Sequence, residues 1–224
     1  MIKRIFEIIT FPLYLIFQFI SLPFKTVKII LNDKKEKKKH NKKTTLRKTS
    51  QEELIEIGQY LFADFKTDFE AFFNSFLKDK RTFIIENKEL LEEYNNFQLD
   101  KLKAIEVIYI FGNSKQKLYL TDWRGEENER EIENFIEDKL LIKINWKNVN
   151  VLRKGVDEKK QRDGKFIIDL LKIIDKDLEP LNKRLVFFNL GWDAHVYTIV
   201  DQTSHNKITD KFGAFFHGTE NLSK

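Results

Sequence analysis

The first 32 residues combine a long apolar run with a regular polar stripe. The chain is almost wholly apolar from Ile5 to Phe24, and residues 8–24 carry no charge. Polar side chains recur every three or four residues, at Lys3, Glu7, Thr10, Tyr14, Gln18, Ser21, Lys25, Lys28 and Asn32. At about 100° per residue, these positions fall on one helical stripe about 80° wide. The pattern predicts an amphipathic helix over residues 1–32 that lies in the membrane interface, with its stripe facing the lipid headgroups.

Two other interpretations of this segment stay open. Its 17 uncharged residues are at the short end of what a membrane-spanning helix needs. In a spanning helix, the excess of Lys and Arg that follows would hold the C-terminal side in the cytoplasm. Alternatively, the amphipathic helix covers a groove on a protein. A cleavable signal peptide is disfavoured, because no small-residue cleavage site follows the apolar run.

Residues 33–49 form a polybasic linker. The side chains expected to meet anionic lipid are Lys34, Lys35, Lys37, Lys38, Lys39, Lys42 and Lys43. Each basic residue near an anionic leaflet contributes about 1 kcal/mol of attraction, so an anionic membrane surface is an expected partner. The run is equally typical of a solvated, disordered linker. It lacks the aromatic residues with which single-stranded RNA is stacked.

Residues 50–224 carry the patterns of a cytosolic globular domain. Ser50 and Glu53 form a capping box, and apolar residues at helical spacing then predict a helix that runs to Leu77. We interpret its phenylalanine stripe as core rather than as a ligand site. Further helices are predicted at 87–97, 128–141 and 163–180, and a short one capped by Ser204.

Strands are predicted in the middle and near the end of the chain. Residues 104–111 and 116–123 are rich in β-branched and aromatic residues, and the Gly112-Asn113 pair between them predicts a hairpin. Residues 142–152 are a further strand candidate, 184–189 and 193–200 predict a closing hairpin, and the chain after Phe216 is expected to fray. Because strands come in pairs between irregularly spaced helices, we expect the α+β class, with an antiparallel or mixed β-sheet packed by helices.

Composition and charge narrow the chemistry. The chain has no cysteine and four histidines, which excludes disulfides, thiol catalysis and thiolate zinc sites. The net charge of +5 is divided, since residues 1–48 carry +10 and residues 49–224 carry −5. The basic excess is confined to one end, so nucleic acid is disfavoured as a partner. No nucleotide or hydrolase motif occurs, and no cofactor or small-molecule ligand is predicted.

Acidic residues at a strand end form one candidate site. Asp122 closes a predicted strand, and Glu126 and Glu127 open the helix that follows. Carboxylates grouped in this way suit a hard cation such as Mg²⁺. Acidic residues are also common in a first helical turn, where they complement the helix dipole. We favour the second interpretation and predict no metal site.

The second candidate site is a strand that carries an aspartate and a histidine. Strand alternation places Asp193, His195 and Tyr197 on one face. Asp193 could orient the imidazole of His195 for acid–base catalysis. More often, such residues form the solvated face of a half-exposed sheet, and no nucleophile pattern accompanies them. An enzyme would require Asp122, Glu126, Asp193 and His195 to meet in one pocket.

Three tryptophans, Trp123, Trp146 and Trp192, lie near predicted strands or turns. Tryptophan at such positions serves either as core or as the anchor of a binding face, because its ring is large and carries a polar N–H. We take Trp123 and Trp192 as the candidate binding residues.

The segment Asp122-Trp123-Arg124-Gly125-Glu126, followed by an acidic helix and later by Trp192-Asp193 and an aromatic strand, resembles a family of uncharacterised bacterial domains of unknown function. The resemblance covers roughly residues 100–212. It implies an α+β domain in a bacterial cytoplasm, in a family sometimes predicted near toxin–immunity genes. It carries no catalytic residues over to this chain.

These observations predict a bacterial protein at the cytoplasmic face of the cell membrane. Its cytosolic domain would bind another protein as an adaptor or immunity-like module. The alternative is a hydrolase-type enzyme at the membrane surface that uses Asp122, Glu126, Asp193 and His195. A third hypothesis is a nucleic-acid tether that works through the basic linker.

Overall fold

The computed structural model describes residues 51–94, 98–157, 161 and 163–222. The predicted membrane helix over 1–32, the polybasic linker over 33–49 and the capping residue Ser50 lie outside these residues. The described residues belong to one unit, Thr49–Lys224. Within the described part of the chain, no helix is long and apolar enough to cross a membrane.

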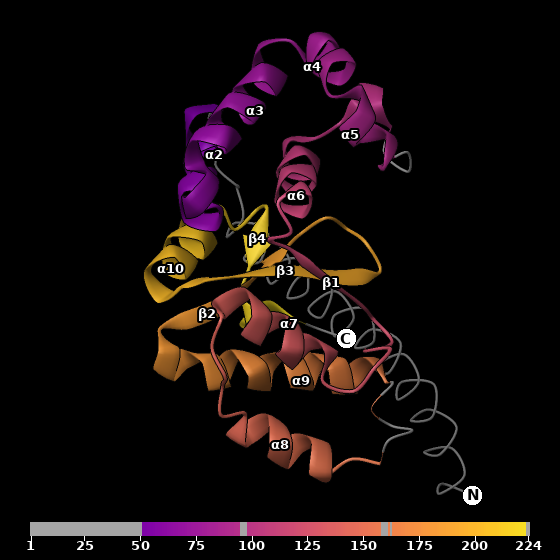
Figure 1. The fold of residues 1–224 in the computed structure, drawn as a ribbon, viewed down its shortest axis with the longest axis vertical. Helices are drawn as coiled ribbons and strands as arrows, with labels where there is room; N and C mark the ends of the chain where they lie inside the picture. The colour runs from indigo at the N-terminus through magenta and orange to yellow at the C-terminus, as the bar shows by residue number, and fades with distance from the viewer. Residues whose placement is uncertain (1–50, 95–97, 158–160, 162, 223–224) are drawn as a thin grey trace, which may run out of the picture. The chain divides into compact units, whose positions relative to one another are not determined.

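A four-stranded antiparallel sheet forms the central layer of this unit (Figure 1). Its strands are β1 (Tyr119–Asp122), β2 (Lys183–Phe188), β3 (Ala194–Asp201) and β4 (Phe216–His217), in the order β1-β3-β2-β4. The predicted closing hairpin is confirmed as β2 and β3, in which Phe187 pairs with Tyr197. The predicted strand over 116–123 is confirmed as the shorter β1.

Helices pack on both faces of the sheet, which confirms the α+β class. The described residues contain α2 (Gln51–Leu61), α3 (Lys66–Lys78), α4 (Lys80–Glu86), α5 (Lys88–Glu92), α6 (Ala104–Ser114), α7 (Glu131–Leu140), α8 (Lys147–Lys154), α9 (Gly164–Leu178) and α10 (Gln202–Lys211). Short 3-10 turns are η1 (Ala63–Phe65), η2 (Leu99–Lys101), η4 (Glu179–Leu181) and η5 (Thr219–Asn221). In Figure 1, α2, α3 and α6 lie on one side of the sheet, and α7, α8 and α9 lie on the other.

The two faces of the sheet therefore contribute to two separate cores. Val186 and Val196 point into the core formed with α2, α3, α6 and α10. Phe187 and Tyr197, one residue further along each strand, point into the core formed with α7, α8 and α9. Tyr197 is fully buried, and its hydroxyl lies 3.0 Å from Thr121 Oγ1. The prediction that this face of β3 is solvated is thus wrong at Tyr197, because a second layer of helices covers it.

The phenylalanine stripe is confirmed as core, but the predicted single helix is broken at Phe62. The Phe62 and Phe69 rings lie 5.5 Å apart, and each also packs against Phe111 of α6. Phe62, between α2 and α3, and Phe69 of α3 thus share one aromatic partner. The predicted helix over 87–97 is observed as the short α5, with Leu91 and Tyr94 buried as expected.

The prediction of a strand at 104–111 is wrong, because this segment is α6. Its residues are buried on nearly every side, so the apolar run carries no helical period that distinguishes it from a buried strand. The Glu106 carboxylate accepts a hydrogen bond from the backbone N–H of Lys103 at 2.7 Å, which closes the N-terminus of the helix. The predicted hairpin around Gly112 is therefore absent among the described residues.

The predicted strand at 142–152 is also wrong, since Lys147–Lys154 forms α8. Its N-terminus is capped by a residue of another helix: the Asp177 carboxylate accepts from the N–H groups of Asn148 (3.0 Å) and Val149 (3.1 Å). The preceding Trp146 is fixed by a hydrogen bond from its indole Nε1 to Glu137, at 2.9 Å. The capping residue Asp177 is 29 residues away from Asn148, so the sequence around α8 contains no signal for the start of this helix.

The C-terminal segment is ordered where fraying was predicted. After β4, the turn η5 is tied to α9 because Thr219 Oγ1 donates to the Asp175 carboxylate at 2.8 Å, and Leu222 is buried. The predicted helix over 163–180 is confirmed as α9, capped by Asp163. The last helix is capped by Asp201, which accepts from Ser204 N at 2.9 Å, and not by Ser204 itself.

Candidate functional site

A cleft of about 640 Å³ opens between one end of the sheet and the start of α9. Its walls come from the end of β1, the β2–β3 loop, the first turn of α9, β4 and the C-terminal turn. Four of the residues singled out in the sequence line it: Trp123, Trp192, Asp193 and His195. Lys165 and His217, which the sequence analysis did not select, line it as well. The cleft thus combines two indoles, two imidazoles, the two carboxylates of Asp163 and Asp193, and one ammonium group.

Trp192 stands on the β2–β3 loop, between this cleft and a second one. The loop turns at Gly191, whose φ of 72° favours glycine. The Trp192 ring packs edge-on against Tyr109 of α6 at 4.9 Å, yet 38% of the residue stays exposed. The second cleft, about 700 Å³, is lined by Trp192, Tyr109, Tyr94 and Leu120. The Trp192 indole therefore lines both clefts.

Trp123 also lines the first cleft. It packs on the start of α9: a β-carbon at Gly164 would approach the Trp123 backbone oxygen to 3.1 Å and its Cε3 atom to 3.3 Å. The Arg124 guanidinium lies 5.7 Å from the centre of the indole ring. Even so, 44% of Trp123 is exposed. Both indoles are held in place by packing and still present an open face.

The two imidazoles lie on the same face of the sheet, on either side of Phe187. His217 stacks on the Phe187 ring at 5.5 Å, and His195 meets it edge-on at 6.4 Å. His217 Nδ1 donates to the Gly218 carbonyl at 2.9 Å, so in the neutral ring Nε2 is an acceptor. Burial lowers the pKa of His195, the charge of His217 lowers it further, and Asp193 raises it. His195 is therefore a neutral base at pH 7.

The structure does not bring Asp122 and Glu126 into the cleft. Asp122 is the exposed last residue of β1; its carboxylate accepts from the Arg124 backbone N–H at 2.8 Å, and this contact lowers its pKa. Glu126 is buried, and its carboxylate accepts from Ile132 N at 3.0 Å and from Arg153 Nη2 at 2.7 Å. Burial raises the pKa of Glu126, against the pull of Arg153. Two of the four residues of the enzyme hypothesis meet, and two do not.

Arg153 joins Glu126 and Glu133 in a buried network that the sequence analysis missed. Its guanidinium donates to both oxygens of Glu133, at 2.8 Å and 2.7 Å, and to Glu126. Arg153 is only 6% exposed. In the described part of the chain, no group of three or more histidine, aspartate or glutamate side chains could hold a metal ion.

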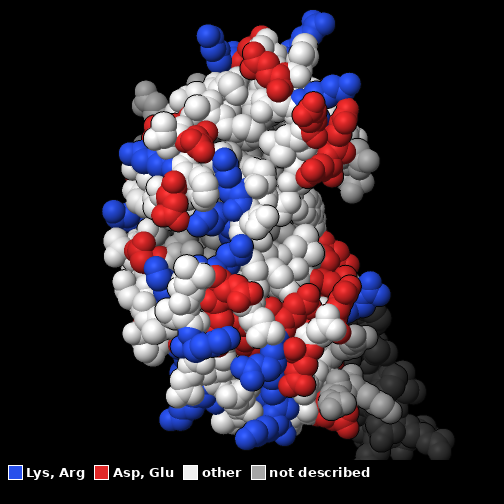
Figure 2. Space-filling view, viewed as in Figure 1, with Lys and Arg blue, Asp and Glu red and all other residues white. Residues whose placement is uncertain are grey.

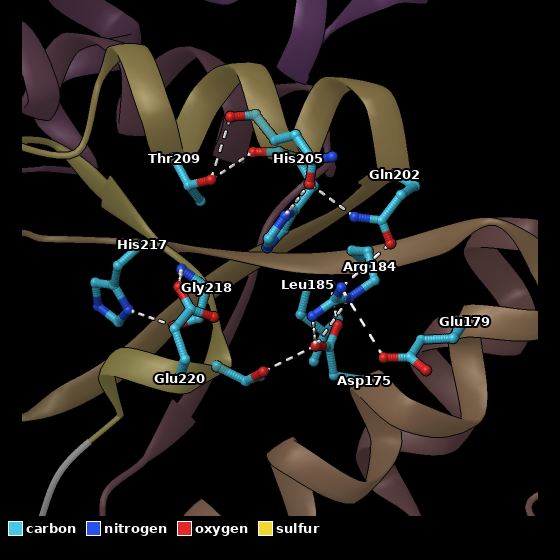
Figure 3. A network of polar contacts seen from close by, with 12 residues as sticks. Asp175, Glu179, Arg184, Leu185, Gln202, His205, Thr209, His217, Gly218 and Glu220 are labelled. Atoms are coloured by element: carbon cyan, nitrogen blue, oxygen red, sulfur yellow. Dashed lines mark hydrogen bonds and ion pairs between the residues drawn. The ribbon is translucent and has the colours of Figure 1, made fainter.

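The C-terminal wall of the cleft is fixed by a second polar network (Figure 3). The Asp175 carboxylate of α9 accepts from Arg184 Nη2 and from Leu185 N, both at 2.7 Å, and from Thr219. This one carboxylate connects α9, β2 and the turn η5. The turn leads into Asn221 and Leu222, which line the cleft.

Charges on the surface are mixed rather than sorted. Figure 2 shows acidic and basic side chains intermingled on the face in view, with no broad patch of a single sign. That face therefore offers no extended basic stripe for a nucleic-acid backbone.

The fold and the cleft define an α+β domain with an aromatic-walled groove at one sheet end. A comparison with protein-family models matches residues 53–220 to the Domain of unknown function (DUF6630). The chain therefore belongs to this family of uncharacterised domains. The match is wider than the resemblance over 100–212, since it also takes in α2 to α5. No curated protein and no solved structure matches the chain.

Proposed function

We propose that this chain is a membrane-associated bacterial protein whose cytosolic domain binds a protein partner, in an adaptor or immunity-like role. The observation that carries the proposal is the pair Trp123 and Trp192, both partly exposed and both on the rim of one cleft. Tryptophan is enriched among the residues that dominate binding energy at protein interfaces, where it borders well-packed pockets.

The arrangement around Trp192 favours a polypeptide over a compact small molecule. The same indole lines two clefts of about 640 and 700 Å³, so a ligand that fills both must pass over the β2–β3 loop. The exposed Leu120 adds apolar surface in the second cleft. A partner segment with a large apolar side chain on either side of Trp192 fits this surface.

The membrane part of the proposal rests on the sequence of residues 1–49. An amphipathic helix over 1–32 and the lysines of 33–49 would supply two anchoring signals at an anionic, cytoplasmic leaflet. The domain would then meet its partner at the membrane surface.

Affinity capture with the full chain, from membranes of the source bacterium, tests the proposal. Trp123→Ala and Trp192→Ala should each reduce the recovery of the same protein at least about tenfold, because interface tryptophans contribute about 2 kcal/mol or more. Val151→Ala is the matched control, since Val151 is an apolar residue of α8, 69% exposed, that does not line the cleft. Recovery of lipid alone, or equal recovery with all three variants, would contradict the proposal.

A hydrolase-type enzyme is the second candidate, favoured by the imidazoles of the cleft. His195 is neutral at pH 7 and lies beside Asp193 and His217, which suits it to act as a general base. The rate of hydrolysis of model esters should then decrease as the pH is lowered, because His195 takes up a proton. The activity should be lost in His195→Gln. Activity that persists in this variant would exclude His195 as the base.

A further inference from the structure

A buried histidine behind the cleft has a ring nitrogen without a partner. Among the described side chains, His205 Nε2 is the only buried nitrogen or oxygen that makes no hydrogen bond. His205 lies on α10 and is 5% exposed. A buried polar atom in this state costs free energy, so its position calls for a physical reason.

The other ring nitrogen defines the state of His205. Nδ1 lies 3.4 Å from Asn206 Oδ1, which also accepts from Gln202 Nε2 at 2.8 Å. Because Oδ1 is an acceptor, the neutral ring carries its proton at Nδ1. Nε2 is then a bare lone pair.

That lone pair faces the C-terminal segment (Figure 3). A β-carbon at Gly218 would lie 2.8 Å from His205 Nε2 and 2.8 Å from Glu220 Oε1, so both groups lie on the side of this glycine where a side chain would project. The Glu220 carboxylate is occupied there, since Oε1 accepts from Gly218 N and from Asn221 Nδ2, each at 3.2 Å. The acceptor Nε2 of His205 and the Glu220 carboxylate thus lie on the same side of Gly218, and neither carries a proton that could form a hydrogen bond between them.

We propose that His205 is a proton-operated latch on the C-terminal wall of the cleft. A proton at Nε2 converts the lone pair into a charged donor that faces Glu220. The carboxylate then turns toward the imidazolium, because a hydrogen bond between a cation and a carboxylate is stronger than the bonds that this carboxylate accepts from the neutral donors of Gly218 and Asn221. Asn221 lines the cleft, as does His217 one residue before Gly218, so the rearrangement reshapes that wall. The consequence for partner binding rests on the proposed function, whereas the latch itself does not.

The surrounding charges set how readily the latch closes. Arg184 of β2 is a competing cation that interacts with Glu220, and it is held by Asp175 at 2.7 Å and by Gln202 at 3.2 Å. Its fixed positive charge attracts Glu220 and opposes a second cation beside it. The titratable and charged groups on the packed elements are Asp175 and Glu179 near α9, Arg184 on β2, His217 on β4, Glu220 on η5, Asp201 and Lys211 at the ends of α10, and Glu56 on α2.

An NMR titration of the full chain from about pH 8 to about pH 5 tests the latch, because this range spans ordinary imidazole protonation. It follows the ring nitrogens of His205 and the backbone amide of Gly218. Both signals should shift with one midpoint in the wild-type chain. In Glu220→Gln, a neutral isostere, the Gly218 amide should lose this shift, whereas His195→Gln should leave it unchanged.

Three results would overturn the latch. The first is a Gly218 amide signal that stays constant while His205 takes up a proton, and the second is a His205 ring that never takes up the proton. The third is a Gly218 shift that persists in Glu220→Gln. No partner takes part in the titration, so it can succeed or fail independently of the proposed function.

Discussion

Arg153 shows how strongly one buried side chain determines the structure around it. Its guanidinium lies between Glu133 and Glu126, with both carboxylates bound at 2.7 Å. Removing one member of a buried ion pair leaves the others desolvated and unpaired. We expect Arg153→Ala to lower the free energy of unfolding by about 3–5 kcal/mol, measured by urea denaturation.

An exposed ion pair provides the comparison for Arg153. Lys88 lies 3.6 Å from Glu92 on the surface of α5, with both side chains largely in solvent. Lys88→Ala should cost less than about 1 kcal/mol. If Arg153→Ala costs no more than Lys88→Ala, the network around Arg153 contributes nothing to stability.

Individual residues were predictable where their role depends on their own type. Trp123 and Trp192 stood out because large aromatic side chains near turns are either core or anchors. Arg153 gave no such signal, since its partner Glu133 is 20 residues away and pairing follows only from how α7 and α8 pack. His217 was placed in a frayed tail, although the preceding Phe215-Phe216 pair indicates a buried strand.

At the scale of elements, the close packing of α6 depends on the absence of a side chain at Gly112. A β-carbon there would lie 2.8 Å from Phe62 Cζ and 2.9 Å from Leu118 Cγ. Overpacking a core costs about 1–3 kcal/mol, and alanine returns up to about 1 kcal/mol of helix propensity. Gly112→Ala should therefore lower the free energy of unfolding by about 1–2 kcal/mol, measured by thermal or urea denaturation.

Gly155 provides the matched control for this substitution. At the end of α8, a β-carbon would meet only Val151 O at 3.5 Å and Leu152 O at 3.6 Å, which are ordinary contacts. Gly155→Ala should leave stability nearly unchanged. Equal losses from the two variants would mean that the contact with Phe62 does not limit packing.

Elements with their own local signals were predicted correctly. α9 has an amphipathic face and the cap Asp163, and β2 and β3 are rich in β-branched and aromatic residues on either side of a turn that contains Gly191. α6 and α8 were mistaken for strands for two different reasons. α6 is buried all round and lacks a visible period, whereas α8 is capped by Asp177 from a distant helix.

At the scale of the whole molecule, we expect the full chain to bind to membranes. The full chain should float with liposomes that contain anionic lipid, and a chain that begins at Ser50 should not, because we propose that residues 1–49 supply both anchoring signals. Neutral liposomes should bind the full chain less, since they lack the charge that attracts the lysines. Flotation of neither chain would assign the N-terminal segment to contact with protein.

The assembly of the cleft could not be predicted from the sequence. The cleft is lined by residues that are distant along the chain: Trp123, Lys165, His195 and His217. The sheet order β1-β3-β2-β4 places β1 beside β3 and β4 beside β2, and α9 adds Lys165. The sequence indicated the hairpin but not this order. The chemistry of the separate residues was therefore foreseeable, and their convergence was not.

The central claim is that the cleft lined by Trp123 and Trp192 binds a protein, and site-specific photo-crosslinking tests this claim most directly. A photoreactive amino acid replaces Lys165 in the cleft, or Val151 on α8 as the control, in the full chain within cells of the source organism. We expect a protein adduct from position 165 that disappears when Trp192→Ala is added, and no such adduct from position 151. Adducts of equal yield from both positions, or lipid alone captured at position 165, would contradict the claim.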